Sequence, residues 1–142
     1  MADYVTQSDM TARIPVSFVT QALDDNGDGV ADDGAWDAVQ SAVQAEIDGT
    51  LSVRYRTPFN SPVPSVVLRS AQVLAAALLY QRRGIADKEN PFSNQADAIR
   101  QTLAKIASGD LPLDPSEDRA LAPVSVISQE SLTHSRRNRI NN

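Results

Sequence analysis

The segment Pro64–Arg83 reads PSVVLRSAQVLAAALLYQRR and is predicted to form the central helix of the chain. Pro64 suits the first turn of a helix, where its missing N–H leaves no hydrogen bond unmade. Gly84 follows directly and can adopt the left-handed conformation in which helices often end. Apolar residues occupy nearly every face in between, and such a helix is normally buried against several neighbours. Arg69 and Ser70 interrupt the apolar run, which favours a helix of a globular core over a membrane span.

Amphipathic helices are predicted on both sides of this segment. Apolar residues recur every three or four positions in Ala35–Tyr55, where Gly49 indicates a bend or a close helix crossing. Ser93–Ser108 presents one apolar face and is followed by Gly109, a residue that commonly ends helices. The core of the chain should therefore consist of these helices packed on the central one.

Two short helices are expected near the N-terminus, one capped by Thr6 or Ser8 and the next by Ser17. The predicted fold is a small all-α bundle with two long central helices, Ala35–Tyr55 and Pro64–Arg83. Residues 1–109 should form the helical domain, and residues 110–142 an extended C-terminal arm.

Composition narrows the class of protein. The chain has 142 residues, of which 42% are hydrophobic and only 5% aromatic, enough for one mostly aliphatic core. The net charge of −5 argues against a dedicated nucleic-acid binder, which usually has a basic face. With no cysteine, the chain has neither a disulfide framework nor a thiolate zinc site. The N-terminus lacks the basic and apolar regions of a signal peptide, so synthesis in the cytoplasm is expected.

The sharpest motif is an acidic loop, residues 24–33, with the sequence DDNGDGVADD. Oxygen-bearing side chains at every second position, followed by a glycine at the sixth, are typical of calcium loops. The twelfth position is Ala35, where an EF-hand has a bidentate glutamate, so the loop resembles a shorter calcium motif. Calcium is the one cofactor that the sequence suggests, and its ligands would be the side chains of Asp24, Asn26, Asp28 and Asp32 and the carbonyl of Val30.

The same loop has an alternative interpretation as a turn without a metal. Asp32 or Asp33 would then cap the following helix, and Asp37 would add favourable charge to its first turn. The sequence leaves both interpretations open.

The C-terminal arm contains three prolines and no periodic helical pattern. It is too apolar for a purely solubilising tail, which indicates a segment that packs on a partner. The partner-binding positions are predicted to be an apolar group and a basic group, Val124, Val126 and Ile127, and Arg136, Arg137 and Arg139.

No catalytic constellation stands out. The single histidine, His134, lies in the arm beside Thr133 and Ser135. The charged residues Glu46, Asp48, Arg54 and Arg56 are interpreted as solvated or inter-subunit charge. An enzyme is therefore not expected.

The order of these features resembles the head–tail adaptor proteins of Mu-like bacteriophages, over roughly Tyr4–Gly109. The resemblance rests on the acidic loop, the string Glu46-Ile47-Asp48-Gly49-x-Leu51, the pair Arg54-Tyr55, the proline-rich link and the alanine-rich helix. Arg54 and Tyr55 are accordingly predicted to bind a partner.

The resemblance implies an all-helical subunit of a dodecameric ring with no catalytic residues. Such a ring lies beneath the portal protein at the capsid vertex, contacts a downstream neck or tail-completion protein, and lets DNA pass through its lumen without sequence-specific binding. It implies a virion protein made in the host cytoplasm, with no membrane partner. A calcium-responsive helical module that binds another protein is the alternative function, and it rests on the acidic loop alone.

Overall fold

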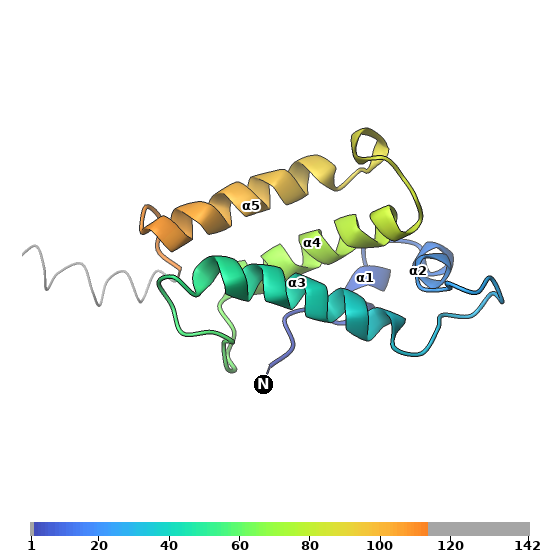
Figure 1. The fold of residues 1–142 in the computed structure, drawn as a ribbon, viewed down its shortest axis with the longest axis horizontal. Coiled ribbons are helices and arrows are strands. Elements are labelled where there is room, and N and C mark those ends of the chain that lie inside the picture. The colour runs from blue at the N-terminus through green and yellow to red at the C-terminus, as the bar shows by residue number, and fades with distance from the viewer. Residues whose placement is uncertain (1, 114–142) are drawn as a thin grey trace, which may run out of the picture. The chain divides into compact units, whose positions relative to one another are not determined.

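The computed structural model describes residues 2–113, and these form five α-helices and one 3₁₀ turn (Figure 1). No strand occurs within the described residues, so the predicted all-α fold is confirmed. The elements are α1 (Gln7–Thr11), α2 (Val16–Ala22), α3 (Ala35–Leu51), α4 (Ser65–Arg82), η1 (Asp87–Glu89) and α5 (Ser93–Ser108).

Helix α4 is the central element, as predicted from its sequence. It contacts α1, α2, α3 and α5, while α3 and α5 also pack against each other. Small side chains make this possible, because Ala71 and Ala75 on one face and Ala76 beside them are completely buried. Gly84 has a φ of 79° and ends the helix in the left-handed conformation, as expected. No helix in the described part of the chain is both long and apolar enough to cross a bilayer.

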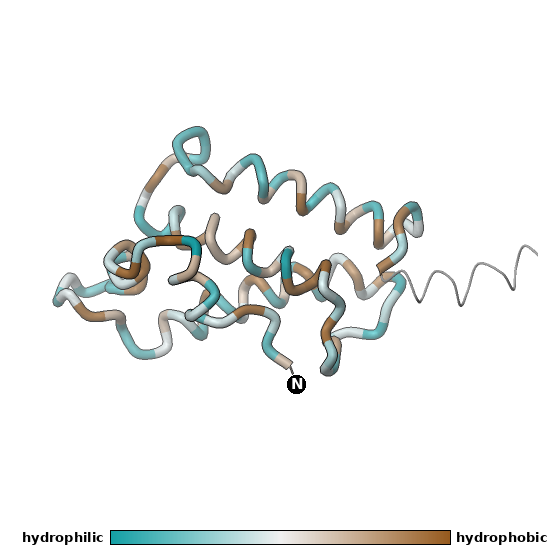
Figure 2. Tube along the Cα trace, turned by 180° about the vertical axis from the view of Figure 1, so that it is seen from behind, coloured by the Kyte–Doolittle hydropathy of each residue, from teal (hydrophilic) through white to brown (hydrophobic). Residues whose placement is uncertain are grey.

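Helix α5 covers the bundle with one apolar face. Ala96, Leu103 and Ile106 are buried, and apolar residues recur along the side of the helix that faces its neighbours (Figure 2). Gly109 follows with a φ of 91°, which confirms the predicted stop. The spacing of apolar residues was therefore sufficient to place this helix.

Several local expectations were wrong. Helix α3 ends at Leu51 instead of Tyr55, because the carbonyl of Leu51 accepts the N–H groups of both Arg54 and Tyr55 in a closing turn. Gly49 has open space where a Cβ would lie, so of its two predicted roles the close helix crossing is wrong, and the bend stays a prediction. Helix α2 begins directly after Pro15 without a side-chain cap, so Ser17 lies inside the first turn.

The first helix starts as expected. The Thr6 hydroxyl accepts the N–H of Asp9, and the Asp9 carboxylate accepts the N–H of Thr6. This reciprocal pair is a capping box, which satisfies two N–H groups that a helix start otherwise leaves free.

Tyr4 joins the N-terminal segment to α3 and to the proline-rich link. Its hydroxyl donates to Asp48 Oδ1 at 2.7 Å and accepts the N–H of Phe59 at 2.8 Å. Burial and the hydrogen bond to Asp48 raise the pKa of Tyr4 to about 12. Nearby, Gln40 Nε2 donates to the carbonyl of Val5. These contacts hold the chain before α1 against the side of α3.

Candidate functional site

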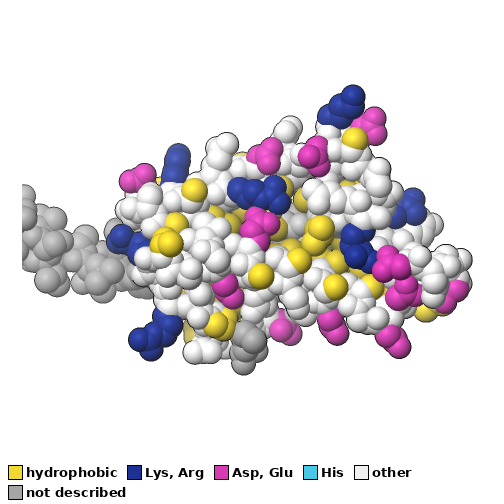
Figure 3. Space-filling model, in the orientation of Figure 1, with side chains coloured by type: hydrophobic (Ala, Val, Ile, Leu, Met, Phe, Trp, Pro, Cys, Tyr) yellow, Lys and Arg dark blue, Asp and Glu magenta, His cyan; other side chains and the backbone are white. Residues whose placement is uncertain are grey.

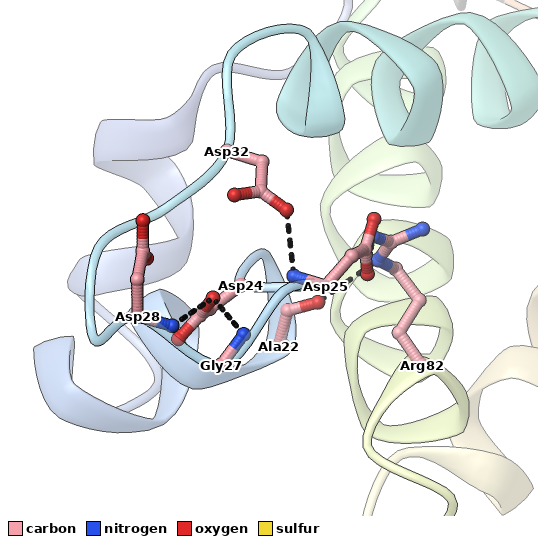
Figure 4. A network of polar contacts seen from close by, with 7 residues as sticks. All are labelled: Ala22, Asp24, Asp25, Gly27, Asp28, Asp32 and Arg82. Carbon is pink, nitrogen blue, oxygen red and sulfur yellow. Dashed lines mark hydrogen bonds and ion pairs between the residues drawn. The ribbon is translucent and has the colours of Figure 1, made fainter.

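The acidic loop connects α2 to α3 and is folded around the carboxylate of Asp24. This carboxylate accepts the N–H groups of Gly27 and Asp28 at 2.8 and 3.2 Å (Figure 4). It also accepts the N–H of Gly29 at 2.7 Å. The hydrogen bonds, led by that of Gly29, hold the pKa of Asp24 below its usual range. Gly27 and Gly29 have φ values of 79° and 85°, a conformation that glycine adopts without strain.

The rest of the loop also binds its own backbone. Asn26 Oδ1 accepts the N–H of Asp28, and Asp28 Oδ1 accepts the N–H of Val30, both at 3.0 Å. Asp32 closes the base of the loop, because its carboxylate accepts the N–H of Asp25 at 2.7 Å and its own N–H donates to Leu23 at 2.8 Å. The loop is thus held in shape by the chain itself.

Three of the predicted ligands lie together. One carboxylate oxygen from each of Asp24, Asp28 and Asp32 lies within 4.8 Å of the other two. Calcium binds oxygen at roughly 2.3–2.6 Å, so oxygens on opposite sides of one ion are up to about 5 Å apart. The spacing therefore fits a shared calcium ion. Asn26 and Val30 complete the predicted ligand set, and calcium at this loop stays a prediction.

The side-chain cap predicted for α3 is not present in the structure. Gly34, with a φ of 80°, stands between Asp33 and α3, and no side chain caps the helix. Asp32 contacts the start of α3 through its main-chain carbonyl, which accepts the N–H of Ala35 at 3.2 Å. Asp37 does lie in the first turn, where negative charge is favourable.

Arg82 anchors the loop to α4, a role that the sequence did not reveal. Its Nε donates to the carbonyl of Ala22 at 2.9 Å, and its Nη2 donates to both carboxylate oxygens of Asp25 at 2.8 and 2.9 Å (Figure 4). The guanidinium group therefore joins the end of α2 and the start of the loop to the end of α4. The only signal in the sequence was a basic residue in the last helical turn.

The charged residues around α3 do not form one cluster. Glu46 accepts a hydrogen bond from Arg100 of α5 at 2.9 Å, and this ion pair raises the pKa of Arg100. Asp48 is engaged by Tyr4 instead. Glu46 and Asp48 thus contact different partners within the chain, and the interpretation of the group as solvated or inter-subunit charge stays a prediction.

Arg54 lies against the end of α5. A Cβ built on Gly109 would be 2.6 Å from Arg54 Nη1, so the guanidinium group occupies the space that this glycine leaves open. Positive charge is favourable at the C-terminal end of a helix. Partner binding by Arg54 and Tyr55 stays a prediction. The other predicted partner-binding positions lie outside the described residues: Val124, Val126, Ile127, Arg136, Arg137 and Arg139.

Comparison with known proteins identifies the family. The family model described as "Bacteriophage Mu, Gp36" matches residues 4–128, which include the acidic loop, all of α1–α5 and part of the arm. No significant match was found among curated proteins or among solved structures. The family match confirms the predicted relationship to Mu-like bacteriophages, and this chain belongs to the bacteriophage Mu Gp36 family.

Proposed function

We propose that this protein is a structural component of the phage particle, the head–tail adaptor between the portal and the tail. The observation that carries the proposal is the family match over residues 4–128. It spans the segments on which the resemblance to adaptor proteins rests, from the acidic loop to the alanine-rich α4. In this proposal the protein forms a dodecameric ring beneath the portal and extends the DNA channel.

The charge of the chain supports passage of DNA without tight binding. The chain carries a net charge of −5, and α3 contains three acidic residues and no lysine or arginine. Phosphate groups bind protein mainly through lysine and arginine side chains. A ring lumen lined by such a surface would let DNA slide toward the tail without sequence-specific contacts.

The arm is proposed to attach the ring to its neighbours, the portal protein and a downstream neck or tail-completion protein. Its sequence combines the apolar run Val124–Ile127 with the basic residues Arg136, Arg137 and Arg139. Apolar residues of an arm become buried when they meet a groove on another chain, and the arginines then pair with acidic groups around it.

Truncation tests this role of the arm. Deletion of residues 121–142 should leave the melting temperature of the helical unit nearly unchanged and block incorporation into particles. A control variant with Arg136, Arg137 and Arg139 changed to glutamine separates the charge contribution from the apolar one. Normal incorporation of the truncated protein would show that the arm is not the attachment segment.

Composition of the purified virion tests the adaptor role itself. Mass spectrometry of particles should detect the protein, and particles lacking its gene product should accumulate as separate heads and tails. Absence of the protein from complete, infectious virions would overturn the proposal.

A second function, a calcium-responsive module that binds another protein, is favoured by one observation. Three carboxylates lie within 4.8 Å of one another in a loop that the chain itself holds in shape. Calorimetry on the free protein would support this function if calcium bound and the helices rearranged on binding. Binding without rearrangement would instead assign the ion a structural role within the adaptor.

A further inference from the structure

The segments that flank α3 carry opposite charge. The helix itself is acidic, and Asp48 in its last turn is bonded to Tyr4. The helix has 17 residues, which at 1.5 Å per residue makes it about 25 Å long. Arg54 and Arg56 follow its C-terminal end. In Figure 3 acidic side chains gather at the end of the helical unit that carries the loop, and several basic side chains lie at the opposite end. The acidic end comprises Asp24, Asp25, Asp28, Asp32, Asp33 and Asp37.

Other helices reinforce this polarity. The contact between Gly109 and Arg54 places the last turn of α5, which contains Lys105, at the basic end. Asp110 follows Gly109 and donates its N–H to the carbonyl of Lys105, so one acidic residue lies beside the three basic ones.

At the acidic end, Arg82 pairs with Asp25. Arg83, which lies over the Phe18 ring of α2, is a second arginine near this end. Two positive charges therefore stand against six carboxylates, and an excess of negative charge remains there.

Each charged end also presents an exposed valine. Val53 has 76% of its surface exposed and directly precedes Arg54 in the basic end. Val30 is 64% exposed and lies between Asp28 and Asp32 in the acidic loop. One exposed apolar residue is ordinary on a protein surface. Here two lie within patches of opposite charge, and apolar anchors surrounded by complementary charge are typical of protein interfaces.

We propose that the acidic loop of one copy docks on the basic end of a second copy, with Val30 against Val53 of that second copy. The ends are separated by the length of α3, so one rigid copy cannot satisfy both patches by itself. A contact between two different surfaces of identical chains is heterologous and closes into rings when the rotation permits. This inference rests on the proposed ring and names the surfaces that join its subunits.

Charge reversal tests the pairing in the full-length chain. The loop variant carries Asp33→Lys and Asp37→Lys, which spares the predicted calcium ligands. The end variant carries Arg56→Glu and Lys105→Glu, which spares the contact of Arg54 with Gly109. Sedimentation velocity at low salt should show association of the wild type, which weakens at high salt because exposed charges are screened. Each variant alone should remain monomeric.

Restoring association by combining the loop and end variants makes the test specific. An equimolar mixture of the loop and end variants should associate, because each reversed patch then meets an opposite charge on the other chain. One chain that carries all four substitutions should also self-associate. Monomeric behaviour in both cases would overturn the proposal, as would a wild type that stays monomeric at low salt or single variants that associate normally.

Two controls address charge and exposure. Arg13 bonds Gln72 in the middle of α4, away from both ends, so Arg13→Glu should leave association unchanged. Val53→Asp should prevent association, whereas Val16→Asp at a similarly exposed position on α2 should not.

If association persists while virions lack the protein, the adaptor role fails and the interface survives. If virions contain the protein and reversal has no effect, only the interface fails.

Discussion

Arg82 and Asp25, which are 57 residues apart in the chain, form a two-oxygen hydrogen-bonded ion pair at 2.8 and 2.9 Å. The pair joins the C-terminal end of α4 to the start of the acidic loop. Since Arg82 also binds the carbonyl of Ala22, one side chain sets the position of the loop relative to the core.

Replacing Arg82 should therefore loosen the loop without unfolding the bundle. The ion pair is exposed and contributes little, so most of the loss comes from the bond to Ala22, about 1 kcal/mol. Urea unfolding of Arg82→Ala should show a decrease of this size in the free energy of unfolding. Hydrogen exchange should accelerate at the loop amides. Arg83→Ala, which removes a neighbouring arginine placed over the Phe18 ring, is the control. Equal protection of the loop in both variants would contradict the anchoring role.

Calcium should stabilise the protein if the loop binds it. A ligand that binds only the folded state raises the melting temperature as its concentration rises. Chelation should reverse the increase, and Asp28→Ala should abolish it. Asp33→Ala is the matched control, because Asp33 lies in the same loop outside the group of three carboxylates. Identical melting curves of the wild type in excess calcium and in chelator would leave the loop as a turn without a metal.

Leu74 should be essential to the core. It lies on α4 and is only 2% exposed. An aspartate there would bury an unpaired charge, which costs several kcal/mol, so Leu74→Asp should unfold the bundle. Circular dichroism measures the loss of helix, with Val16→Asp as the exposed control. A fully helical and soluble Leu74→Asp variant would show that Leu74 is not part of the core.

Replacement by alanine should destabilise the protein more at Gly109 than at Gly84. Both have positive φ values, of 91° and 79°, so alanine is strained at each by roughly 1 kcal/mol. At Gly109 the new Cβ also meets Arg54, whereas at Gly84 it meets open space. Chemical unfolding should show the larger loss for Gly109→Ala, and Arg54→Ala should remove the difference. Equal losses at the two glycines would show that the Arg54 side chain moves away from the new Cβ at no measurable cost.

The protein should lose stability at alkaline pH because Tyr4 is held in its neutral form in the folded chain. Its pKa is raised from 10.0 to about 12, so the unfolded chain loses the proton before the folded chain does. The stabilisation from neutral Tyr4 is complete below pH 10 and decreases as the pH rises toward 12. Urea unfolding across this pH range should show a decrease in the free energy of unfolding of the wild type. This decrease should be absent from Tyr4→Phe and present in Tyr55→Phe. The same decrease in Tyr4→Phe would assign it to another group.

The elements that could be predicted from the sequence are those set by local pattern. Apolar spacing and a following glycine located α4 and α5, and alternate acidic residues predicted that Asp24, Asp28 and Asp32 converge. Contacts between distant segments could not be predicted in this way. Arg82 with Asp25 and Tyr4 with Asp48 depend on how the helices pack, and no local pattern encodes that packing.

The C-terminal end of α3 and the cap at its start were not predictable in this way. The apolar pattern of α3 continues to Tyr55, yet the helix stops at Leu51 and exposes Val53. Before α3, a glycine with positive φ separates the aspartates from the first turn, so an acidic residue near a helix start did not become its cap. Both outcomes depend on backbone conformation, which competes with the side-chain preferences that a sequence displays.

Electron microscopy of the phage neck tests the central claim most directly. If the protein is the head–tail adaptor, reconstruction of intact virions should show a ring of its helical bundles directly beneath the portal, around the DNA channel. Labelling of the protein should place it in that ring. A complete neck in which the ring beneath the portal is made of another protein would contradict the account.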